Sequence, residues 1–310
     1  MRILITGGAG FIGRRLIGHV RGLGHDVIVV DAGFTGVLTD VPDDCRLVER
    51  DIASITGSDW DELLAGCDIV FHLAARKYNT PGVTAEQLIA TNVNATWQLA
   101  QAAARASVSR LVFTSSLYAY GALGPDLMRE TDVPLPRTLY GSSKLMGEHI
   151  LRTVGLESGL SWNCARLFFV YGPGQYADGG YKSVIVTNLE RMAAGLAPTI
   201  CGDGEQALDY VYVDDAVEAL WTLATAEPTS QVLNVASGRA RSINDLTAAM
   251  IGVVGEKFTP ETLAADWTAG TSRAGDPSLC RTTIGWSATS DLATGLAGTW
   301  HTLRRDDPGR

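Results

Sequence analysis

Tyr140 and Lys144 are the residues with the clearest capacity for proton transfer. They stand four positions apart in a segment predicted to be helical, so the phenol and the ammonium would share one helix face. A tyrosine has an unperturbed pKa of about 10 and is a poor base at neutral pH. A neighbouring cation stabilises the phenolate and lowers that pKa. The pair can therefore serve as an acid/base couple, although the same spacing also occurs on ordinary helix surfaces.

Hydroxyl groups at the end of a predicted strand support this interpretation. The apolar residues 111–113 are followed by Thr114, Ser115 and Ser116. Open α/β sheets bind their ligands at the carboxyl ends of the strands. A hydroxyl at that place can hold a substrate oxygen while Tyr140 takes its proton. We expect at least one of the two serines to cap the strand end instead.

The first thirteen residues predict a site for phosphate groups. A strand-like apolar run over residues 3–5 is followed by Gly7, Gly10 and Gly13, and then by a helical pattern to about residue 23. A turn without side chains lets the backbone approach a pyrophosphate, and the helix N-terminus offers free N–H groups. Three glycines alone are a weak signal, and a tight turn without a ligand is the alternative.

Asp31 makes the phosphate site specific for a dinucleotide. It ends a second strand-like run, residues 27–30, and lies 18 residues after Gly13. A carboxylate at this place can accept hydrogen bonds from both hydroxyls of the adenosine ribose. The chain has no Arg or Lys between Asp31 and Arg46 that could meet a 2′-phosphate. The sequence therefore predicts NAD rather than NADP.

The composition excludes several classes of protein. The 310 residues suffice for one large or two modest domains, and the net charge of −9 without a basic patch argues against a nucleic-acid partner. The apolar runs are too short for a membrane span, and the N-terminus does not resemble a signal peptide. The five cysteines are widely spaced, without a Cys-x-x-Cys pair. We therefore expect a cytoplasmic protein with neither disulfides nor a metal site.

Strand-like and helix-like segments alternate through about residue 170, which predicts an α/β fold with a doubly wound parallel sheet. Further strands are expected at 46–50, 69–73, 111–116 and 164–170, and long helices at 84–105 and 139–155. We expect residues 1–173 to form the NAD-binding domain. Residues 174–310 would mainly form a smaller α/β substrate domain. The strands near 209–213 and 232–236 are expected to return to the large sheet.

Several motifs then occur in a familiar order. They are Gly7-Gly-Ala-Gly-Phe-Ile-Gly13, His72-Leu-Ala-Ala75, Thr91-Asn92-Val93, Ser115-Ser116 with Tyr120-Gly121, Tyr140-x-x-x-Lys144, Val170-Tyr-Gly-Pro173, Gly202-Asp-Gly-Glu-Gln206, Tyr212-Val-Asp-Asp215 and Arg273-Ala-Gly-Asp276. Together they resemble the extended short-chain dehydrogenase/reductases, in the branch of NAD-dependent nucleotide-sugar epimerases and dehydratases. The resemblance covers nearly the whole chain. It implies a Rossmann fold, bound NAD and a homodimer.

The resemblance also implies roles for individual residues. Ser116 would be the catalytic hydroxyl, Tyr140 the acid/base, and Lys144 the group that binds the nicotinamide ribose and tunes Tyr140. Arg273 would pair with the diphosphate of the substrate, a role that suits its fork of donors. The implied cofactor contacts, beside Tyr140 and Lys144, are Gly7, Gly10, Phe11, Ile12, Gly13, Asp31, Asp51, Ile52, Leu73, Ala74, Ala75, Lys77, Asn92, Thr114, Phe168 and Val170. Among these, Asp51 and Ile52 would contact the adenine.

The chain departs from the family pattern beside the catalytic serine. Leu117 and Tyr118 stand where the 4,6-dehydratases of this family carry an Asp-Glu acid/base pair. Dehydration of that type is therefore disfavoured.

Two further departures concern the substrate. Phe169 stands where sugar-nucleotide epimerases commonly carry an Asn, and Leu208 where many carry an Arg that contacts the diphosphate. Arg76 and Lys182 are the candidate replacement cations. For Lys182, a solvated surface charge is the alternative.

These features favour a nucleotide-sugar epimerase that inverts C4 through a 4-keto intermediate and retains its NAD. A dehydrogenase or reductase with exchangeable NAD would use the same tyrosine and lysine. A non-catalytic NAD-binding protein is the third possibility, against which the intact set of catalytic residues argues. In a homodimer, the helices at 84–105 and 139–155 would pair with their copies, with Leu88, Leu99 and Leu145 as candidate contacts.

Overall fold

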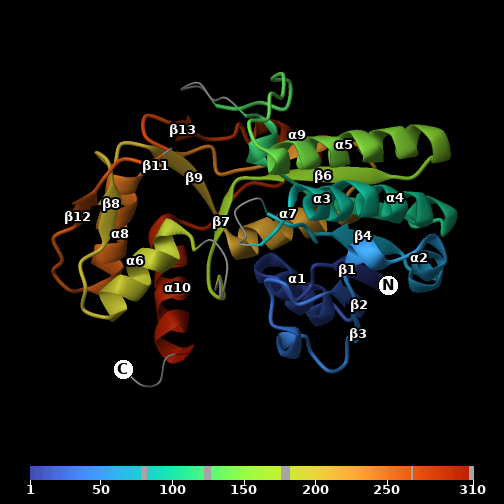
Figure 1. Cartoon of the computed structure of the whole chain (residues 1–310), viewed down its shortest axis with the longest axis horizontal. Coiled ribbons are helices and arrows are strands. Elements are labelled where there is room, and N and C mark those ends of the chain that lie inside the picture. Colours follow the sequence, from blue (N-terminus) through green and yellow to red (C-terminus); the bar gives the residue numbers. More distant parts are fainter. Residues whose placement is uncertain (78–81, 122–126, 176–181, 267, 307–310) are drawn as a thin grey trace.

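The computed structural model describes residues 1–77, 82–121, 127–175, 182–266 and 268–306. Within these ranges the chain forms a large parallel sheet between two layers of helices and a smaller assembly of short strands and helices beside it (Figure 1). None of the helices in this part of the chain has the length and apolarity needed to cross a bilayer.

The large sheet has the order β10-β6-β5-β4-β1-β2-β3, and all its described neighbours pair in parallel. Its strands are β1 (Arg2–Thr6), β2 (Asp26–Asp31), β3 (Arg46–Glu49), β4 (Ile69–His72), β5 (Arg110–Ser116), β6 (Trp162–Leu167) and β10 (Val232–Val235). The strand order reverses at β1, which lies between β2 and β4. In such sheets the ligand binds outside the carboxyl ends at this point. The predicted doubly wound fold is confirmed.

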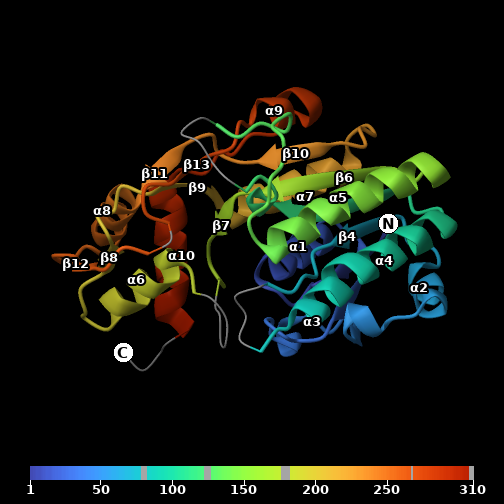
Figure 2. The same cartoon turned by 45° about the horizontal axis from the view of Figure 1, so that its top comes forward.

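Helices cover both faces of this sheet (Figures 1 and 2). Alternate residues of β1 separate the two layers, because Ile3 and Ile5 belong to one core cluster and Leu4 to the other. The first cluster holds α1 (Phe11–Gly22) and α7 (Val213–Thr225), and the second holds α2 (Gly57–Leu64), α4 (Ala95–Arg105) and α5 (Leu139–Ser158). A strand buried on both faces needs the continuous apolar run that β1 has.

The predicted long helix at 84–105 is interrupted by one wide turn. Thr84 and Gln87 form the capping box that begins α3 (Ala85–Ile89). A π-helical turn, Ala90–Asn94, then precedes α4. Such turns are frequent at functional sites, and this one carries the buried Asn92.

The expected strand at 164–170 is split between two sheets. It ends in the large sheet at Leu167 and resumes as β7 (Phe169–Tyr171), which pairs with β9 (Ala207–Tyr212). Two further strands, β11 (Ala240–Ser242) and β13 (Ser272–Arg273), also pair with β9. The other elements here are β8 (Thr199–Cys201), β12 (Glu261–Leu263), α6 (Val184–Ala193), α8 (Ile243–Val254), α9 (Ser278–Ile284) and α10 (Leu292–Asp306), with short 3₁₀ turns at Leu38–Asp40, Ile52–Ser54 and Leu117–Ala119.

The expectation that the strand near 209–213 returns to the large sheet is wrong. Its counterpart β9 belongs to the second sheet, whereas the strand near 232–236 does join the large sheet as β10. The buried Asp209 explains the position of β9, because its carboxylate accepts hydrogen bonds from the backbone N–H groups of Ser237, Gly238 and Gly275. These bonds tie β9 to the loop after β10 and to the segment that follows β13.

Two of the candidate dimer contacts lie in the core. Leu88 and Leu99 are buried, and Leu145 is half-buried. On α4 and α5 the exposed large apolar side chains include Trp97 and Met146 instead.

A comparison of two glycines in α1 tests the packing of the glycine turn. A Cβ on Gly13 would lie 2.3 Å from the carbonyl oxygen of Gly7 and 2.7 Å from the Cα of Gly8, and backbone atoms cannot move aside cheaply. Gly13→Ala should therefore destabilise the protein by about 1–3 kcal/mol in chemical denaturation.

Gly18 is the matched control. It lies exposed on the same helix, with no atom within 4 Å of an added Cβ. Gly18→Ala should stabilise the protein by about 0.5–1 kcal/mol. Equal effects of the two substitutions would contradict the close packing at Gly13.

Candidate active site

The ammonium of Lys144 is buried at the carboxyl end of β5. It donates a hydrogen bond of 2.7 Å to the carbonyl oxygen of Thr114 and lies 4.7 Å from the centroid of the Phe113 ring. Burial, together with the positive charge of Lys77, lowers the pKa of Lys144 to about 7. A group that accepts a hydrogen bond from this ammonium would favour its charged form.

Tyr140 lies one helical turn before Lys144. Thr138 caps α5 by accepting a hydrogen bond from the backbone N–H of Gly141, which places Tyr140 in the first turn. The ammonium of Lys144 is 5.8 Å from the centroid of the Tyr140 ring. The half-buried phenol and the buried ammonium therefore belong to one site, as the helical spacing predicts.

Tyr118 joins this pair to Ser116. The two tyrosine rings meet edge to face, with centroids 6.0 Å apart. The backbone N–H of Tyr118 donates to the hydroxyl of Ser116, at 3.3 Å. The structure therefore brings the three residues predicted as catalytic to one end of β5, with Tyr118 between Ser116 and Tyr140.

Ser115 has a different environment, which decides between the two serines. Its hydroxyl donates to the carboxylate of Glu148, a short contact in the core. Glu148 in turn accepts two hydrogen bonds from the guanidinium of Arg166, at 2.9 and 2.7 Å, and both side chains are 5% exposed. Although burial opposes it, the bond to Glu148 raises the pKa of Arg166. Ser115 is thus held in a structural ion-pair network, whereas Ser116, the predicted catalytic hydroxyl, lies outside that network.

The glycine turn lies against the loop that follows β4. Gly7 has a φ of +73°, and a Cβ on it would lie 2.6 Å from the backbone nitrogen of Ala74. Gly10 precedes the first turn of α1 and accepts a backbone hydrogen bond from Arg14. The predicted cofactor residues of these two segments therefore lie next to one another. They are Gly7, Gly10, Phe11, Ile12, Gly13, Leu73, Ala74 and Ala75.

His72 braces the strands beneath this turn. Its Nδ1 lies 2.7 Å from the hydroxyl of Thr6 on β1, and its Nε2 lies 2.8 Å from that of Thr96 on α4. Thr6 also accepts a hydrogen bond from the backbone N–H of Ala74. Burial lowers the pKa of His72 to about 3, so the ring is neutral near pH 7. We infer a structural role for this histidine.

The carboxylate of Asp31 lies between the glycine turn and the loop after β2. One oxygen accepts a hydrogen bond from the backbone N–H of Ala9 at 2.9 Å, and the other from that of Gly33 at 2.8 Å. Asp31 itself is half-buried. This position suits the predicted contact with a ribose, because a carboxylate oxygen can accept more than one hydrogen bond.

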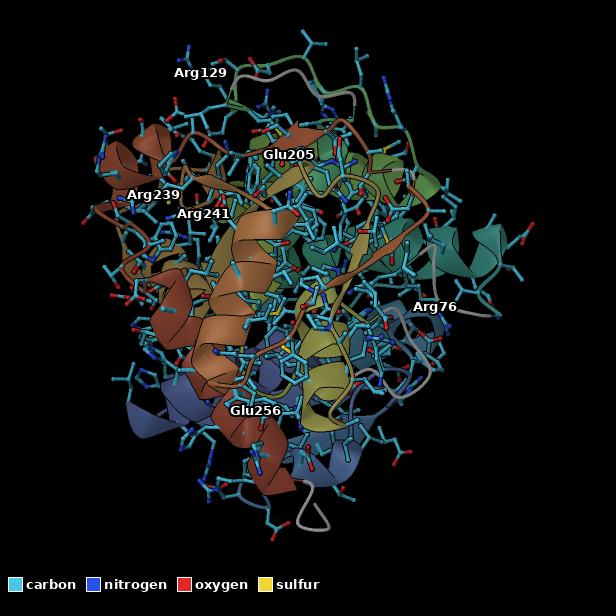
Figure 3. All side chains as sticks on the ribbon, turned by 90° about the vertical axis from the view of Figure 1, so that its left-hand side faces the viewer. Arg76, Arg129, Glu205, Arg239, Arg241 and Glu256 are labelled. Carbon is cyan, nitrogen blue, oxygen red and sulfur yellow. The ribbon has the colours of Figure 1, made fainter. Side chains whose placement is uncertain are left out.

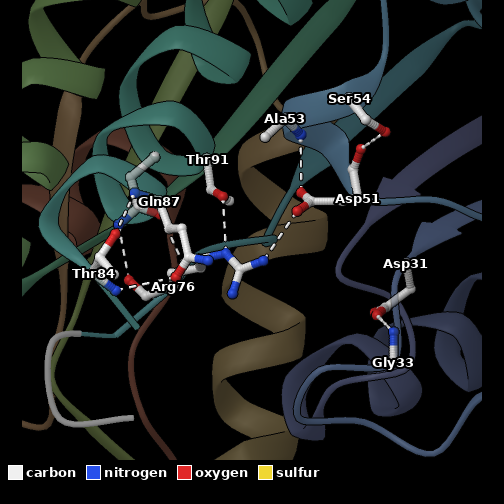
Figure 4. Close-up of polar contacts among 10 residues, drawn as sticks. Asp31, Gly33, Asp51, Ala53, Ser54, Arg76, Thr84, Gln87 and Thr91 are labelled. Carbon is white, nitrogen blue, oxygen red and sulfur yellow. Dashed lines mark hydrogen bonds and ion pairs between the residues drawn. The ribbon is translucent and has the colours of Figure 1, made fainter. Parts of the chain in front are cut away.

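The guanidinium of Arg76 is held by side chains of two neighbouring segments. Its guanidinium donates to the carboxylate of Asp51 at 3.0 Å and to the hydroxyl of Thr91 at 3.2 Å (Figure 4). It also lies over the ring of Phe34, 3.9 Å from the centroid. That Arg76 is a substrate cation stays a prediction, and in the structure its guanidinium is held by Asp51, a predicted adenine contact.

Asn92 fixes the loop that carries Arg76. Its side chain accepts a hydrogen bond from the backbone N–H of Arg76 and donates one to the backbone oxygen of the same residue. It donates a second to the hydroxyl of Ser143 on α5, at 3.0 Å. Lys77 follows in this loop, and its charge acts on Lys144. The predicted cofactor residues after β4 are thus tied to the helix that carries Tyr140.

Three of the predicted substrate residues lie on the second sheet. Arg273 of β13 is paired in register with Leu208 of β9, and its guanidinium carbon lies 6.0 Å from the centroid of the Tyr118 ring. Phe169 packs at a tilt against Tyr210, with centroids 6.1 Å apart. Tyr118 therefore connects the predicted diphosphate residue with the predicted acid/base.

Three other predicted site residues are Phe168, Val170 and Lys182. The ring of Phe168 is buried against Gly275, and Val170 is half-buried beside Val211. The exposed Lys182 forms an ion pair with Glu190, at 2.8 Å, which accounts for its charge at the surface.

Arg241 is a candidate that the sequence does not single out. It lies on β11, directly opposite Leu208 and just before α8 (Figure 3). Directly paired residues of neighbouring strands share one face of the sheet. Leu208 is therefore flanked by Arg241 on one side and Arg273 on the other. Only the strand pairing reveals this, because the three residues are far apart in the chain.

Comparison with known proteins gives one family. The model of the NAD dependent epimerase/dehydratase family matches residues 3–236. The chain is 32% identical to the UDP-glucose 4-epimerase of Mycolicibacterium smegmatis, over 96% of this chain and 97% of that one. The UDP-glucose 4-epimerase of Thermotoga maritima, solved with UDP-glucose, superposes with a TM-score of 0.91 at 29% identity and 99% coverage of both chains.

MoeE5, solved with UDP-glucuronic acid and NAD, superposes with a TM-score of 0.87 at 31% identity, over 99% of this chain and all of the other. The family model spans most of the chain, including the glycine turn, Asp31, Tyr140 and Lys144. The protein therefore belongs to the NAD-dependent epimerase/dehydratase family of extended short-chain dehydrogenase/reductases.

Proposed function

We propose that the protein is a nucleotide-sugar epimerase that inverts C4 through a 4-keto intermediate and retains its NAD. The observation that carries this proposal is the convergence of Ser116, Tyr140 and Lys144 at the carboxyl end of β5. The related proteins named above are UDP-glucose 4-epimerases or bind UDP-sugars.

The described residues fit NAD. The glycine turn has no room for side chains at Gly7 and Gly13. The N–H groups of Gly7, Ala9 and Gly10 are bonded within the protein, so a pyrophosphate would be met by the N–H groups in the first turn of α1. Asp31 offers its carboxylate at the predicted ribose position. When bound, NAD supplies the chemistry of accepting a hydride and returning it.

Three side chains manage the proton of the substrate hydroxyl. Tyr140 as phenolate removes the proton from the C4 hydroxyl and returns it after the keto sugar has turned. Ser116 donates a hydrogen bond to the same oxygen. Lys144 stabilises the phenolate through its charge. Its ammonium donates one N–H to the carbonyl oxygen of Thr114, which leaves two N–H groups for other acceptors. Tyr140 acts only while Lys144 carries its proton.

The substrate diphosphate would lie on the second sheet, between Arg273 and Arg241. An Arg at 208 is absent, but Arg241 extends from the neighbouring position on the same face. Phe169 and Leu208 leave the surroundings less polar than the pattern of the family, which favours a deoxygenated or otherwise modified sugar.

A reductase or dehydrogenase acting on a 4-keto sugar is the second candidate, because the same residues serve it. Retention of NAD separates the two reactions, since an epimerase needs none added. Leu117 and Tyr118, both in the short turn after Ser116, offer no carboxyl for a 4,6-dehydratase.

We further propose a cytoplasmic homodimer. The exposed Trp97 and Met146 on α4 and α5 would lie at its twofold axis, and the mass in light scattering tests the assembly.

A substitution at Tyr140 tests the reaction. The protein as purified, without added NAD, should epimerise at least one of a panel of nucleotide sugars that includes UDP-glucose, as followed by proton NMR. Tyr140→Phe should keep the fold and the bound NAD while turnover falls by a factor of about 10²–10⁴. An unchanged rate in this variant would remove Tyr140 from the mechanism, and dependence on added NADH would favour the reductase.

Asp31 should set the choice of cofactor. The 2′-phosphate of NADP would lie next to the carboxylate of Asp31. Repulsion between two negative charges in contact corresponds to a loss on the order of 100-fold in the affinity for NADP. Calorimetry of the NAD-free protein should show this preference for NAD, and Asp31→Ser should narrow it. Asp26→Ser, at the other end of β2, serves as the control and should leave the preference intact. Equal wild-type affinities for the two cofactors would refute the role of Asp31.

The diphosphate site can be tested with three arginines. Arg273→Ala and Arg241→Ala should each raise the KM about tenfold or more with little change in kcat, because each removes a charge-assisted hydrogen bond. Arg239→Ala is the control, since Arg239 is equally exposed but lies before β11. If Arg241→Ala behaves like Arg239→Ala, the diphosphate depends on Arg273 alone.

A further inference from the structure

Arg76 joins the loops that follow three strands of the large sheet, β2, β3 and β4. Its guanidinium binds Asp51, which follows β3 (Figure 4). It also covers the ring of Phe34, which follows β2, while its own backbone follows β4. The Arg76 side chain is 14% exposed in the ion pair, although Phe34 is 55% exposed. An exposed aromatic ring is thus covered on one face by an arginine that is itself largely buried.

The place of this cluster relates it to the cofactor. Asp31 and Asp51, the predicted ribose and adenine contacts, end the same two strands that Arg76 bridges. The other carboxylate oxygen of Asp51 accepts a hydrogen bond of 2.9 Å from the backbone N–H of Ala53. The adenosine half of NAD would therefore lie against the carboxylates that Arg76 and its neighbours hold in position.

We propose that Arg76 and Phe34, fixed by Asp51, form a latch that closes the adenosine end of the site and slows the release of NAD. The guanidinium is planar and can stack on an adenine as it does on Phe34. The latch extends the proposed function and depends on it in one respect: an epimerase that lost NADH between its two hydride transfers would be left with a keto sugar that it could not reduce.

The two sides of the latch have different anchors. On one side, Asn92 holds the backbone of Arg76 through both its N–H and its carbonyl oxygen. On the other side, the loop of Phe34 leans on the glycine turn, because a Cβ on Gly36 would lie 2.3 Å from the carbonyl oxygen of Ala9. Separation of Arg76 from Phe34 would therefore free the loop that borders both the ribose and the pyrophosphate positions.

Release of the cofactor can be measured without turnover. Protein freed of NAD is loaded with NADH, and the loss of NADH fluorescence is followed after excess NAD is added. Arg76→Met keeps the length of the side chain and removes its charge, and Phe34→Ala removes the ring. Each should raise the dissociation rate constant of NADH about tenfold. The double variant should be no faster than the faster single variant, because the two groups act on one another.

Arg105→Met is the matched control. Arg105 forms an ion pair of 2.6 Å with Asp61 at the end of α4 and touches none of the predicted cofactor residues. It should release NADH at the wild-type rate. Phe34→Leu adds a conservative change at an exposed position and should show an intermediate rate.

The outcomes separate the latch from the proposed reaction. Wild-type release from both Arg76→Met and Phe34→Ala would overturn the latch even if the protein epimerises sugars. Effects that simply multiply in the double variant would overturn the coupling of Arg76 and Phe34. If the protein epimerises no sugar but the single variants release NADH faster than the wild type, the latch would be supported and the proposed reaction would be refuted.

Discussion

The buried ammonium of Lys144 imposes the constraint on which the rest of the site depends. A buried cation is costly unless it is hydrogen-bonded or paired. Here the carbonyl oxygen of Thr114 accepts its hydrogen bond and the Phe113 ring lies below it. Both belong to β5, so α5 must lie directly against this strand. Gly147 permits that approach, because a Cβ there would lie 2.5 Å from the Phe113 ring. The position of Tyr140 follows from the same contact.

The same core contains a second buried charge, the carboxylate of Glu148, which is stabilised by its own ion pair. Glu148 follows Lys144 by one helical turn, yet it binds Arg166 and Ser115 rather than the ammonium. Since the ion pair with Arg166 satisfies this carboxylate, Lys144 is left to act on the phenol of Tyr140 and on a cofactor. Breaking such a buried pair would strand a charge in the core. The network thus directs the carboxylate of Glu148 to Arg166 and Ser115 instead of a direct ion pair with Lys144.

Sequence reasoning succeeded where the determining interactions are local. The glycine turn, Asp31 at the end of a strand, and the spacing of Tyr140 and Lys144 each depend on a few adjacent residues, and the structure places them as expected. It failed where partners are distant. No local pattern shows that β9 pairs with β7 rather than with the large sheet, because the polar groups that hold Asp209 come from two later segments.

Side-chain direction was the other limit. The sequence offered Arg76 as a substrate cation because it follows the loop of β4, and a long side chain in a loop can turn either way. In the structure its partners are Thr91, Asp51 and the ring of Phe34, which lie on the predicted adenosine side. Likewise, Ser115 and Ser116 are adjacent and differ by which face of β5 they occupy. Alternation sends one to Glu148 and leaves the other beside Tyr118.

In the second sheet, a positive charge near position 208 can be kept although that position holds a leucine. Loss of an arginine at 208 forfeits a charge-assisted hydrogen bond of roughly 1.5–3 kcal/mol, which corresponds to about one to two decades in affinity. Cβ atoms of directly paired residues are only about 4.5–5.5 Å apart, within the reach of an arginine side chain. Arg241 can therefore bring its guanidinium to the place that an arginine at 208 would have filled. Because the charge then comes from the edge strand, position 208 is left to an apolar side chain, in the core cluster against which Phe169 packs. Under the proposed function, diphosphate binding and sugar selectivity would fall to different strands, so that one could change without loss of the other.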